Sequence, residues 1–421
     1  MLLPRTKPAV RRAAPAAFAL ALAFASAACT AKPTEIWTDR PELAVYASAF
    51  NASQQRYRVA VRHHEGLSEA VSAARRKPAL VIGSYLRSES FRKQLVSLDY
   101  LFGELAINQS LFYPELLAKG NVDGRQLLLP LSFNLPMAIF RDVDPPPLPV
   151  GMVATLADLE PAALAFNRKS GRDYTAMGFS PRWYGETMLL AAWAAGASFR
   201  EGTPLAWSDE ALEKALGTLR EWASRVNGSI EAEDDFQFKY LYLPPYASVL
   251  EKRTLFAVLR SDRFFLVPEA SRGLLDFRWY GEGGRIPVLG DAVWAGILRS
   301  GAGKQGAEAF LGWLFSEATQ AELLQSSKRL RLTESVFGIA GGFSSLSAVN
   351  DRWFPLVYPA MEGRTVAGSN LVAPNILPFD WPSIESEVAI PFLEAAAGRS
   401  PPEDARSDFR RRLADWVSKR K

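Results

Sequence analysis

Residue patterns that mark catalysis or metal binding are sparse in this sequence. The only two histidines, His63 and His64, are adjacent, and neighbours in a strand point to opposite faces, so the pair does not easily chelate one metal. The nucleophile elbow Gly-x-Ser-x-Gly is missing, because the stretch 178–182 lacks the second glycine. The single cysteine excludes a multi-cysteine metal site. We therefore expect no catalytic residue, no metal and no cofactor.

Two stretches could bind a cofactor or carry out catalysis, but each also has a simpler structural explanation. Residues 301–306 read Gly-Ala-Gly-Lys-Gln-Gly, which matches the dinucleotide-binding pattern Gly-x-Gly-x-x-Gly between an expected strand and an expected helix. A tight strand-to-helix turn needs the same glycines for steric reasons alone, and we favour that interpretation. The acidic run 231–235 offers carboxylates for a glycosidase pair, but such a run is more often a solvated loop, which we expect here.

The composition is that of a globular protein with more than one domain. The chain has 421 residues, of which 48% are hydrophobic and 22% charged. The first 28 residues contain four basic side chains and no acidic one, which leaves 45 basic against 45 acidic side chains in the remainder. A neutral body argues against a nucleic-acid partner, because phosphate binding requires a basic surface.

The N-terminal segment has the pattern of an export signal. A basic start is followed by an apolar run over 13–28 that ends in Ser26-Ala27-Ala28-Cys29. This end resembles the lipobox of bacterial lipoproteins, although Ser26 stands where a larger aliphatic residue is usual. We expect a signal peptide over 1–28 and a lipid anchor on Cys29, with an ordinary signal peptide as the alternative. Nothing after Cys29 is apolar and long enough for a membrane helix, so the lipid anchor is the expected membrane contact.

Strand and helix patterns alternate along the rest of the chain, which predicts an α/β fold. The proline-rich run 144–149 predicts a linker. The last helix is expected to open with a capping box at 400–403. The other expected strands are 35–38, 57–61, 79–83, 254–259 and 292–298, and the other expected helices are 43–50, 67–77, 180–195, 208–226 and 307–318.

Several segments together carry a family resemblance. They are the first strand 35–38 with its helix, 129–134, 183–186, 253–264, 287–297, 306–311, 374–378, Trp381 and 395–399. In this combination the chain resembles the bacterial extracellular solute-binding proteins of ATP-binding-cassette importers, in particular the maltose-binding-like sugar-binding lipoproteins. The resemblance covers most of the chain after Cys29.

The resemblance implies a two-lobed periplasmic-binding-protein fold of type II, with a hinge that the chain crosses more than once. It implies a first lobe over 29–143, a second lobe over 144–288, a return over 289–330, and a helical part over 331–421 that packs mainly on the second lobe. A small solute, most simply a sugar, would then bind between the lobes and induce hinge closure. The implied partners are importer permease subunits, and the implied state is a monomer at the outer side of the membrane.

The candidate ligand contacts lie at strand ends and helix starts, where such a cleft would form. The alternative role of Asp39 is to cap a helix. For Trp294 and Trp381, the alternative to ligand contact is packing within a lobe. The candidates are Trp37, Asp39, Glu65, Ser84, Tyr85, Asn134, Trp183, Tyr184, Asp262, Arg263, Trp294 and Trp381.

Two other functions stay open on the sequence alone. One is a secreted carbohydrate-active enzyme that uses a pair of the scattered carboxylates. The other is a surface lipoprotein that binds a peptide or a host molecule with the same fold. Product release from glycosides distinguishes the first from a receptor, and pull-down against small solutes distinguishes the second.

Overall fold

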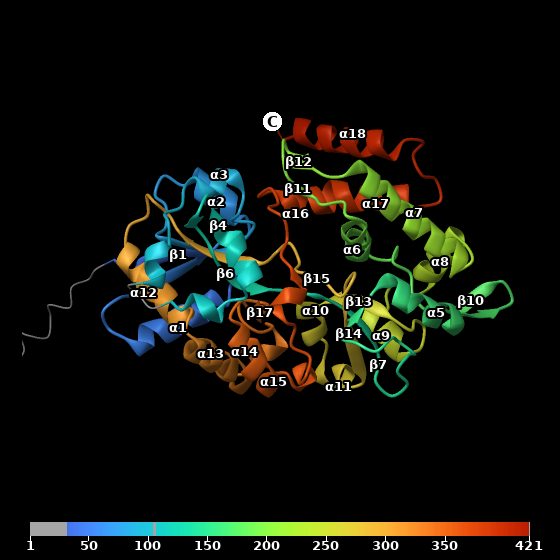
Figure 1. Ribbon diagram of the computed structural model, residues 1–421, viewed down its shortest axis with the longest axis horizontal. Helices are drawn as coiled ribbons and strands as arrows, with labels where there is room; N and C mark the ends of the chain where they lie inside the picture. Colours follow the sequence, from blue (N-terminus) through green and yellow to red (C-terminus); the bar gives the residue numbers. More distant parts are fainter. Residues whose placement is uncertain (1–31, 104–106, 421) are drawn as a thin grey trace, which may run out of the picture.

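The protein forms two lobes that lie side by side along its long axis, each built around its own β-sheet (Figure 1). The computed structural model describes residues 32–103 and 107–420, and the structural statements below concern these residues. The expected α/β architecture is confirmed. The signal peptide expected over 1–28 and the lipid anchor expected on Cys29 lie outside the described residues.

The first lobe is built on a six-stranded mixed sheet. Its strands lie in the order β17 (Phe343–Ser344), β6 (Leu129–Phe133), β16 (Val293–Ile297), β3 (Leu80–Ser84), β1 (Thr34–Thr38) and β2 (Val59–His63). β1 pairs in parallel with β2 and β3, whereas β16 is antiparallel to β3 and β6. All residues of β3, β6 and β16 are buried, as expected for strands covered on both faces.

Four helices of the described chain cover this sheet. They are α1 (Leu43–Ser53), α2 (Leu67–Ala73), α12 (Lys304–Leu314) and α13 (Glu317–Arg329). The helix expected over 307–318 ends at Leu314, where a second helix, α13, which the sequence analysis did not predict, follows. Leu43, Tyr46, Ala47 and Phe50 of α1 are all buried, which confirms the helical spacing. The Phe50 ring meets the Phe310 ring of α12 edge-on at 5.3 Å between centroids, so α1 and α12 share one core.

The glycine-rich run 301–306 forms the end of the turn after β16 and the first residues of α12, and its glycines are required for steric reasons. Gly303 has φ +86°, a left-handed conformation that favours glycine. A β-carbon at Gly306 would lie 2.2 Å from the Oγ1 atom of Thr34 in β1. The run therefore allows α12 to pack closely on β1, which supports the steric interpretation over the dinucleotide-binding one.

The second lobe is built on a four-stranded sheet with helices around it. The strand order is β13 (Ala257–Arg260), β7 (Pro136–Arg141), β14 (Leu275–Tyr280) and β8 (Val153–Ala154). Its main helices are α5 (Leu156–Phe166), α6 (Gly185–Ala195), α7 (Asp209–Arg225), α8 (Ile230–Lys239), α9 (Pro245–Leu250) and α10 (Ser261–Phe265). Ser208 caps α7 as predicted, because its Oγ accepts a hydrogen bond from the Ala211 amide at 3.3 Å.

Three local expectations in and around this lobe are wrong. The helix expected from residue 180 begins at Gly185, because residues 181–184 form a turn that precedes it. The acidic run 231–235 is helical and belongs to α8, where Glu233 is fully buried. The last helix, α18 (Ala405–Ser418), is capped by Asp404 and has no capping box at 400–403.

The chain crosses between the lobes three times. It leaves β6 for β7 through residues 134–135, and it returns from β14 to β16 through 281–292, which include β15 (Ile286–Pro287). It crosses again through 373–380, between β18 (Leu371–Val372) and α16 (Trp381–Ile384). The hinge is thus crossed more than once, as expected. The proline-rich run 144–149 follows β7, so the first crossing precedes the boundary expected at residue 144.

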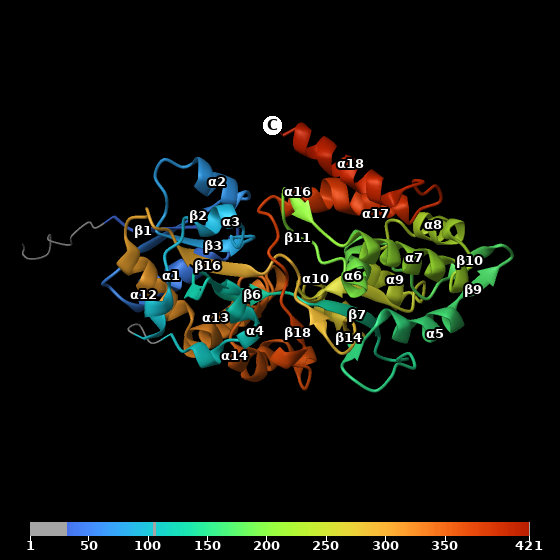
Figure 2. The same ribbon diagram turned by 45° about the horizontal axis from the view of Figure 1, so that its top comes forward.

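The segment after residue 331 is divided between the two lobes. β17, α14 (Ser347–Arg352) and α15 (Phe354–Val357) contribute to the core of the first lobe and the base of the hinge. α16, the π-helical turn η7 (Glu385–Ala389), α17 (Ile390–Ala396) and α18 pack on α6 and α7 of the second lobe (Figure 2). The segment from residue 331 as a whole therefore does not pack mainly on the second lobe, because β17 pairs with β6 of the first sheet. The part from residue 381 onward lies on the second lobe, and before it Arg364 pairs with Asp276 of β14.

Candidate functional site

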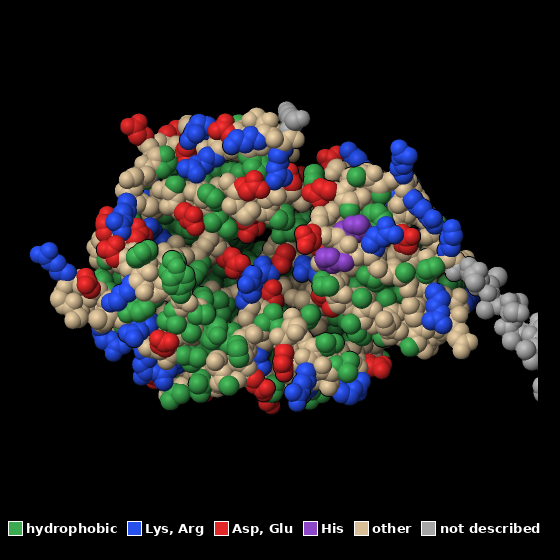
Figure 3. All heavy atoms as spheres, turned by 180° about the vertical axis from the view of Figure 1, so that it is seen from behind, with side chains coloured by type: hydrophobic (Ala, Val, Ile, Leu, Met, Phe, Trp, Pro, Cys, Tyr) green, Lys and Arg blue, Asp and Glu red, His purple; other side chains and the backbone are tan. Residues whose placement is uncertain are grey.

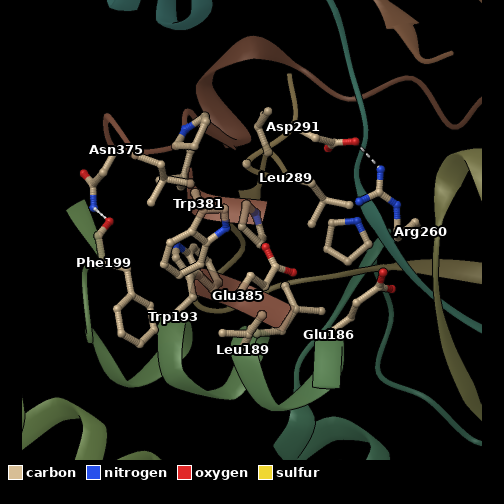
Figure 4. Close-up of a pocket in the computed structure, with 18 of the residues that line it drawn as sticks. Glu186, Leu189, Trp193, Phe199, Arg260, Leu289, Asp291, Asn375, Trp381 and Glu385 are labelled. Atoms are coloured by element: carbon tan, nitrogen blue, oxygen red, sulfur yellow. Dashed lines mark hydrogen bonds and ion pairs between the residues drawn. The ribbon is translucent and has the colours of Figure 1, made fainter. Parts of the chain in front are cut away.

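A cavity of about 330 Å³ lies between the lobes, beside the crossing segments. Its wall combines aromatic and apolar side chains with a few charged groups, which is typical of sites for small molecules (Figure 4). Its aromatic, polar and charged side chains come from the first lobe, from α6 and β13 of the second lobe, from the crossing segments and from the C-terminal helices. They include Tyr85, Glu186, Trp193, Arg260, Asp291, Asn375, Trp381 and Glu385.

The cavity continues into a second hollow on the side of the first lobe. Tyr85, Arg260, Asp291 and Glu385 line both hollows. Charged side chains gather in the hollow at the centre of the face seen in Figure 3. We call the two hollows together the interlobe groove. The second hollow adds Asp39, Arg40, His63, Glu65, Glu69, Ser84 and Asp380.

Tyr85 reaches from the end of β3 toward the second lobe. Its backbone has φ +58°, in the left-handed region, which costs a residue other than glycine about 1–2 kcal/mol. Its partly buried ring packs against the core cluster formed by α6, α7 and the C-terminal helices. Burial, together with the charge of Asp291, raises the pKa of its hydroxyl well above the ordinary value. Tyr85 thus stays a neutral hydrogen-bonding group at the junction of the lobes.

A network of charged groups forms the floor of the groove. Arg260 pairs with Asp291 and donates from Nε to Asp262 at 3.0 Å. Arg40 donates to Ser84, whose Oγ donates to the Asp291 carbonyl at 2.8 Å. Burial alone would raise the pKa of Asp291, but the charges of Arg260 and Arg40 outweigh it and hold that pKa below its ordinary value. The network fixes a charged carboxylate at the hinge.

Glu186 and Glu385 differ from these groups because no lysine or arginine of the described chain forms an ion pair with either. Glu186 lies in the first turn of α6, and Glu385 begins the π-helical turn, an irregularity that is frequent at functional sites. Burial raises the pKa of both carboxyl groups. The negative charges of Glu186 and Asp291 add to this effect and raise the pKa of Glu385 to about 7.

Solved structures with the same arrangement are numerous, although the sequence has diverged. No protein-family model matches this sequence, and no curated protein matches it either. The sugar-binding protein MalE from Xanthomonas citri has a TM-score of 0.64 at 14% identity, over 92% of this chain and 100% of its own. An ABC substrate-binding protein from Listeria monocytogenes in complex with cycloalternan has a TM-score of 0.62 at 13% identity, over 91% of this chain and 98% of its own.

A third structure, the cyclic α-maltosyl-1,6-maltose binding protein from Arthrobacter globiformis, has a TM-score of 0.61 at 15% identity. It covers 91% of this chain and 98% of its own. This chain has the fold of these sugar-binding proteins. The expected resemblance and the type II two-lobed fold are therefore confirmed, and the groove occupies the space between the two lobes of that fold.

Five of the twelve predicted ligand contacts line the interlobe groove, and three more line an adjoining hollow whose wall comes from the second lobe alone. Asp39, Glu65, Ser84, Tyr85 and Trp381 line the interlobe groove. The other three lie in the adjoining hollow, which shares Glu186 with the groove: Trp183, Tyr184 and Arg263. Asp39 also accepts a hydrogen bond from the Ser84 amide at 2.9 Å, so it joins β1 to β3 in addition to its place in the wall. Ligand contact by these residues stays a prediction.

The remaining four predicted contacts do not line the hollows, for distinct structural reasons. Trp37 packs on the His64 ring at 4.4 Å, and Trp294 is 2% exposed beneath the guanidinium group of Arg87. The amide of Asn134 donates to the Gly341 carbonyl at 2.9 Å and so fixes the first crossing. Asp262 does not line the groove because its carboxylate is paired with Arg260.

Several groove residues escaped the sequence analysis. Arg260 is the last residue of strand β13, and Asp291 lies just before β16. The criterion that placed candidate contacts at strand ends could therefore have identified both. Trp193 and Glu385 lie within helical segments, and no local pattern indicates which side of the segment faces a groove. The charged, amide and aromatic groove residues that were missed are Arg40, His63, Glu69, Glu186, Trp193, Phe199, Arg260, Asp291, Asn375, Phe379, Asp380 and Glu385.

Two searches of the described ranges limit the other kinds of site. Within residues 32–103 and 107–420, no helix has both the length and the apolar character needed to cross a membrane. In the same ranges, no three histidine, cysteine or acidic side chains are grouped so that they would hold a metal ion.

Proposed function

We propose that this protein is an extracytoplasmic receptor that captures a carbohydrate in the interlobe groove and delivers it to an ATP-binding-cassette importer. The observation that carries the proposal is the groove itself, whose wall comes from both lobes and combines Tyr85, Trp193 and Trp381 with charged hydrogen-bonding groups. Aromatic rings stack on the C–H faces of sugars while polar groups bind the hydroxyls. The sugar-binding proteins with the same fold add support.

Capture would proceed by closure of the lobes around the solute. A ligand shifts the balance between open and closed forms only through contacts that it makes better in one of them. Tyr85 belongs to the first lobe and Trp193 to the second, so a solute that contacts both favours the closed form. No bond needs to be made or broken in this cycle.

The Trp193→Ala variant tests the proposal. Trp193 is partly exposed on α6 and lines the cavity, so removal of its ring should weaken sugar binding about 10- to 100-fold through lost apolar burial and stacking. Calorimetric titration with gluco-, manno- and malto-oligosaccharides measures this change. The matched control is Trp313→Ala, because Trp313 packs on Phe50 and Phe310 of the first lobe, far from the groove lining.

Two outcomes would contradict the receptor proposal. If no oligosaccharide binds the wild-type protein, the groove is not a sugar site. If bound glycosides are cleaved and the products are released, the protein is an enzyme that uses carboxylates of the groove. Binding without product, lost in Trp193→Ala and retained in Trp313→Ala, is the expected result.

We also propose that Cys29 is acylated after removal of residues 1–28, and that the acyl chains hold the receptor at the outer side of the membrane, beside its permease. Two chains hold a protein firmly, whereas one anchors it only marginally. The Cys29→Ser variant should lose incorporation of a labelled fatty acid and move from the membrane fraction to the soluble fraction. Unchanged fractionation of Cys29→Ser would contradict the anchor. Size-exclusion chromatography of the released protein tests the expected monomer.

A further inference from the structure

The interlobe groove concentrates negative charge in a protein whose body is neutral. Residues 29–421 have equal numbers of basic and acidic side chains, yet seven carboxylates and only two guanidinium groups line the groove. A cleft lined by one sign of charge focuses the field and raises the local concentration of ions of the opposite sign. The carboxylates belong to Asp39, Glu65, Glu69, Glu186, Asp291, Asp380 and Glu385, and the guanidinium groups to Arg40 and Arg260.

The two guanidinium groups are already committed to other partners. Arg260 pairs with Asp262 and Asp291, and Arg40 pairs with Asp39 at 3.3 Å while it also donates to Ser84. Arg260 and Arg263 act on Glu186, and Arg260 acts on Glu385, only from beyond ion-pair distance. Neither carboxylate therefore has a lysine or arginine of the described chain paired with it in the cavity.

The geometry brings these two carboxylates to one place. Glu186 rises from the start of α6 and Glu385 from the first position of η7, and both line the same cavity. Figure 4 shows the Glu186 carboxylate beside that of Glu385, on the side of Arg260. The indole rings of Trp193 and Trp381 stand beside Glu385 in the same view. Carboxylates combined with indole faces are the groups that bind an organic ammonium ion, through Coulomb attraction and cation–π contact.

We propose that the solute of this groove carries a protonated amine, held between Glu186 and Glu385, on a hydroxylated sugar-like body. This inference rests on the proposed function and specifies its substrate class as amino sugars and similar polyhydroxylated amines. When the closing lobes exclude water, a neutral sugar would leave each ionised carboxylate without an ion-pair partner or force it to take up a proton, and either costs free energy. An ammonium group removes that cost.

The protonation behaviour of Glu385 agrees with this assignment. Burial is the main reason that the pKa of Glu385 is raised, and the charges of Glu186 and Asp291 add to it. A hydrogen bond with Trp381 and the charge of Arg260 act in the opposite direction, and the neutral Tyr85 also faces Glu385. Because its pKa is raised to about 7, Glu385 is mostly protonated at about pH 5 and gains negative charge as the pH rises toward neutrality. Affinity for an amine should therefore increase from about pH 5 to about pH 7.

Matched sugars that differ only in the substituent at C2 of each ring test the inference. The probes are the β-1,4-linked disaccharide of glucosamine, its N-acetylated form and cellobiose, with the pairs galactosamine–galactose and mannosamine–mannose. Calorimetry at neutral pH and low salt should show at least one amino sugar binding tenfold or more tighter than its neutral counterpart. The Glu186→Gln and Glu385→Gln variants should each reduce that preference about tenfold. Glu362→Gln, an exposed acid outside the groove, should retain it.

Each other outcome has a distinct meaning. If neutral sugars bind and no amino sugar is preferred in any pair, the inference is overturned while the receptor proposal stands. If no sugar of either kind binds, the receptor proposal fails as well. If an amine preference survives in both glutamine variants, with melting curves that show both to be folded, the assignment to Glu186 and Glu385 is wrong.

Discussion

The Arg182→Met substitution is expected to lower the free energy of unfolding by about 3–5 kcal/mol at neutral pH. Arg182 Nη1 donates to the Glu233 carboxylate at 2.7 Å, and the two side chains are only 8% and 0% exposed. Methionine keeps much of the volume of the arginine but removes its charge. The Glu233 carboxylate then stays buried without its cation, and this uncompensated charge accounts for the loss.

The loss should depend on pH, and the direction follows from Glu233. Burial raises the pKa of Glu233 above its ordinary value, although Asn227 and Arg182 act in the opposite direction. Without Arg182 this pKa rises further, so the variant is penalised wherever Glu233 is ionised in the folded state. The penalty relative to the wild type is complete above the folded pKa of Glu233 in the variant. It fades as the pH falls through the folded pKa values of the variant and the wild type, which both lie above the ordinary value of 4.5. Urea unfolding at about pH 7 and about pH 4 measures the difference.

Arg225→Met is the matched control for this prediction. Arg225 pairs with Glu160 at the same distance, 2.7 Å, but its side chain is 64% exposed, and exposed pairs contribute about 0–1 kcal/mol. If Arg182→Met costs no more than Arg225→Met, the buried pair does not stabilise the second lobe. An equal loss at both pH values would contradict the role assigned to the Glu233 charge.

Glu233 also shows where sequence reasoning reached its limit. A run of five residues with four acids reads as a solvated loop, because charges are rarely buried without partners. Its partner, Arg182, lies 51 positions earlier, and only the packing of α8 beside the turn at 181–184 brings the two together. Near the C-terminus, by contrast, the error is local. Asp404 caps α18, although the sequence analysis placed the capping box at 400–403.

The parts predicted well are those that local physics decides. The apolar run 79–83 predicted the buried strand β3 within one residue at each end, and helical spacing predicted the buried face of α1. The strand-end criterion correctly placed Ser84 and Tyr85 at the interface, since the ends of neighbouring parallel strands meet at one sheet edge. Glu385 could not be found in this way, because its position depends on how the C-terminal helices dock on α6.

The Phe337→Ala substitution is expected to cost about 3–5 kcal/mol, the range for removing a buried phenylalanine ring. Phe337 is 1% exposed and stacks on Phe265 at 4.5 Å with an angle of 4° between the rings. Phe265 belongs to α10 of the second lobe, whereas Phe337 contacts Phe343 of β17 in the first sheet. The aromatic cluster at the base of the hinge therefore couples the two lobes.

Because Phe337 lies between the lobes, we expect Phe337→Ala to reduce the cooperativity of unfolding as well as the stability. If the cluster couples the lobes, Phe337→Ala should separate the unfolding of the two lobes into distinct calorimetric transitions. Phe392→Ala is the control for cooperativity, because Phe392 is equally buried but lies in the cluster of the second lobe. Phe238→Ala, at 80% exposure, should change stability by less than about 0.5 kcal/mol. A single transition in Phe337→Ala, unchanged in width, would show that the lobes are coupled elsewhere.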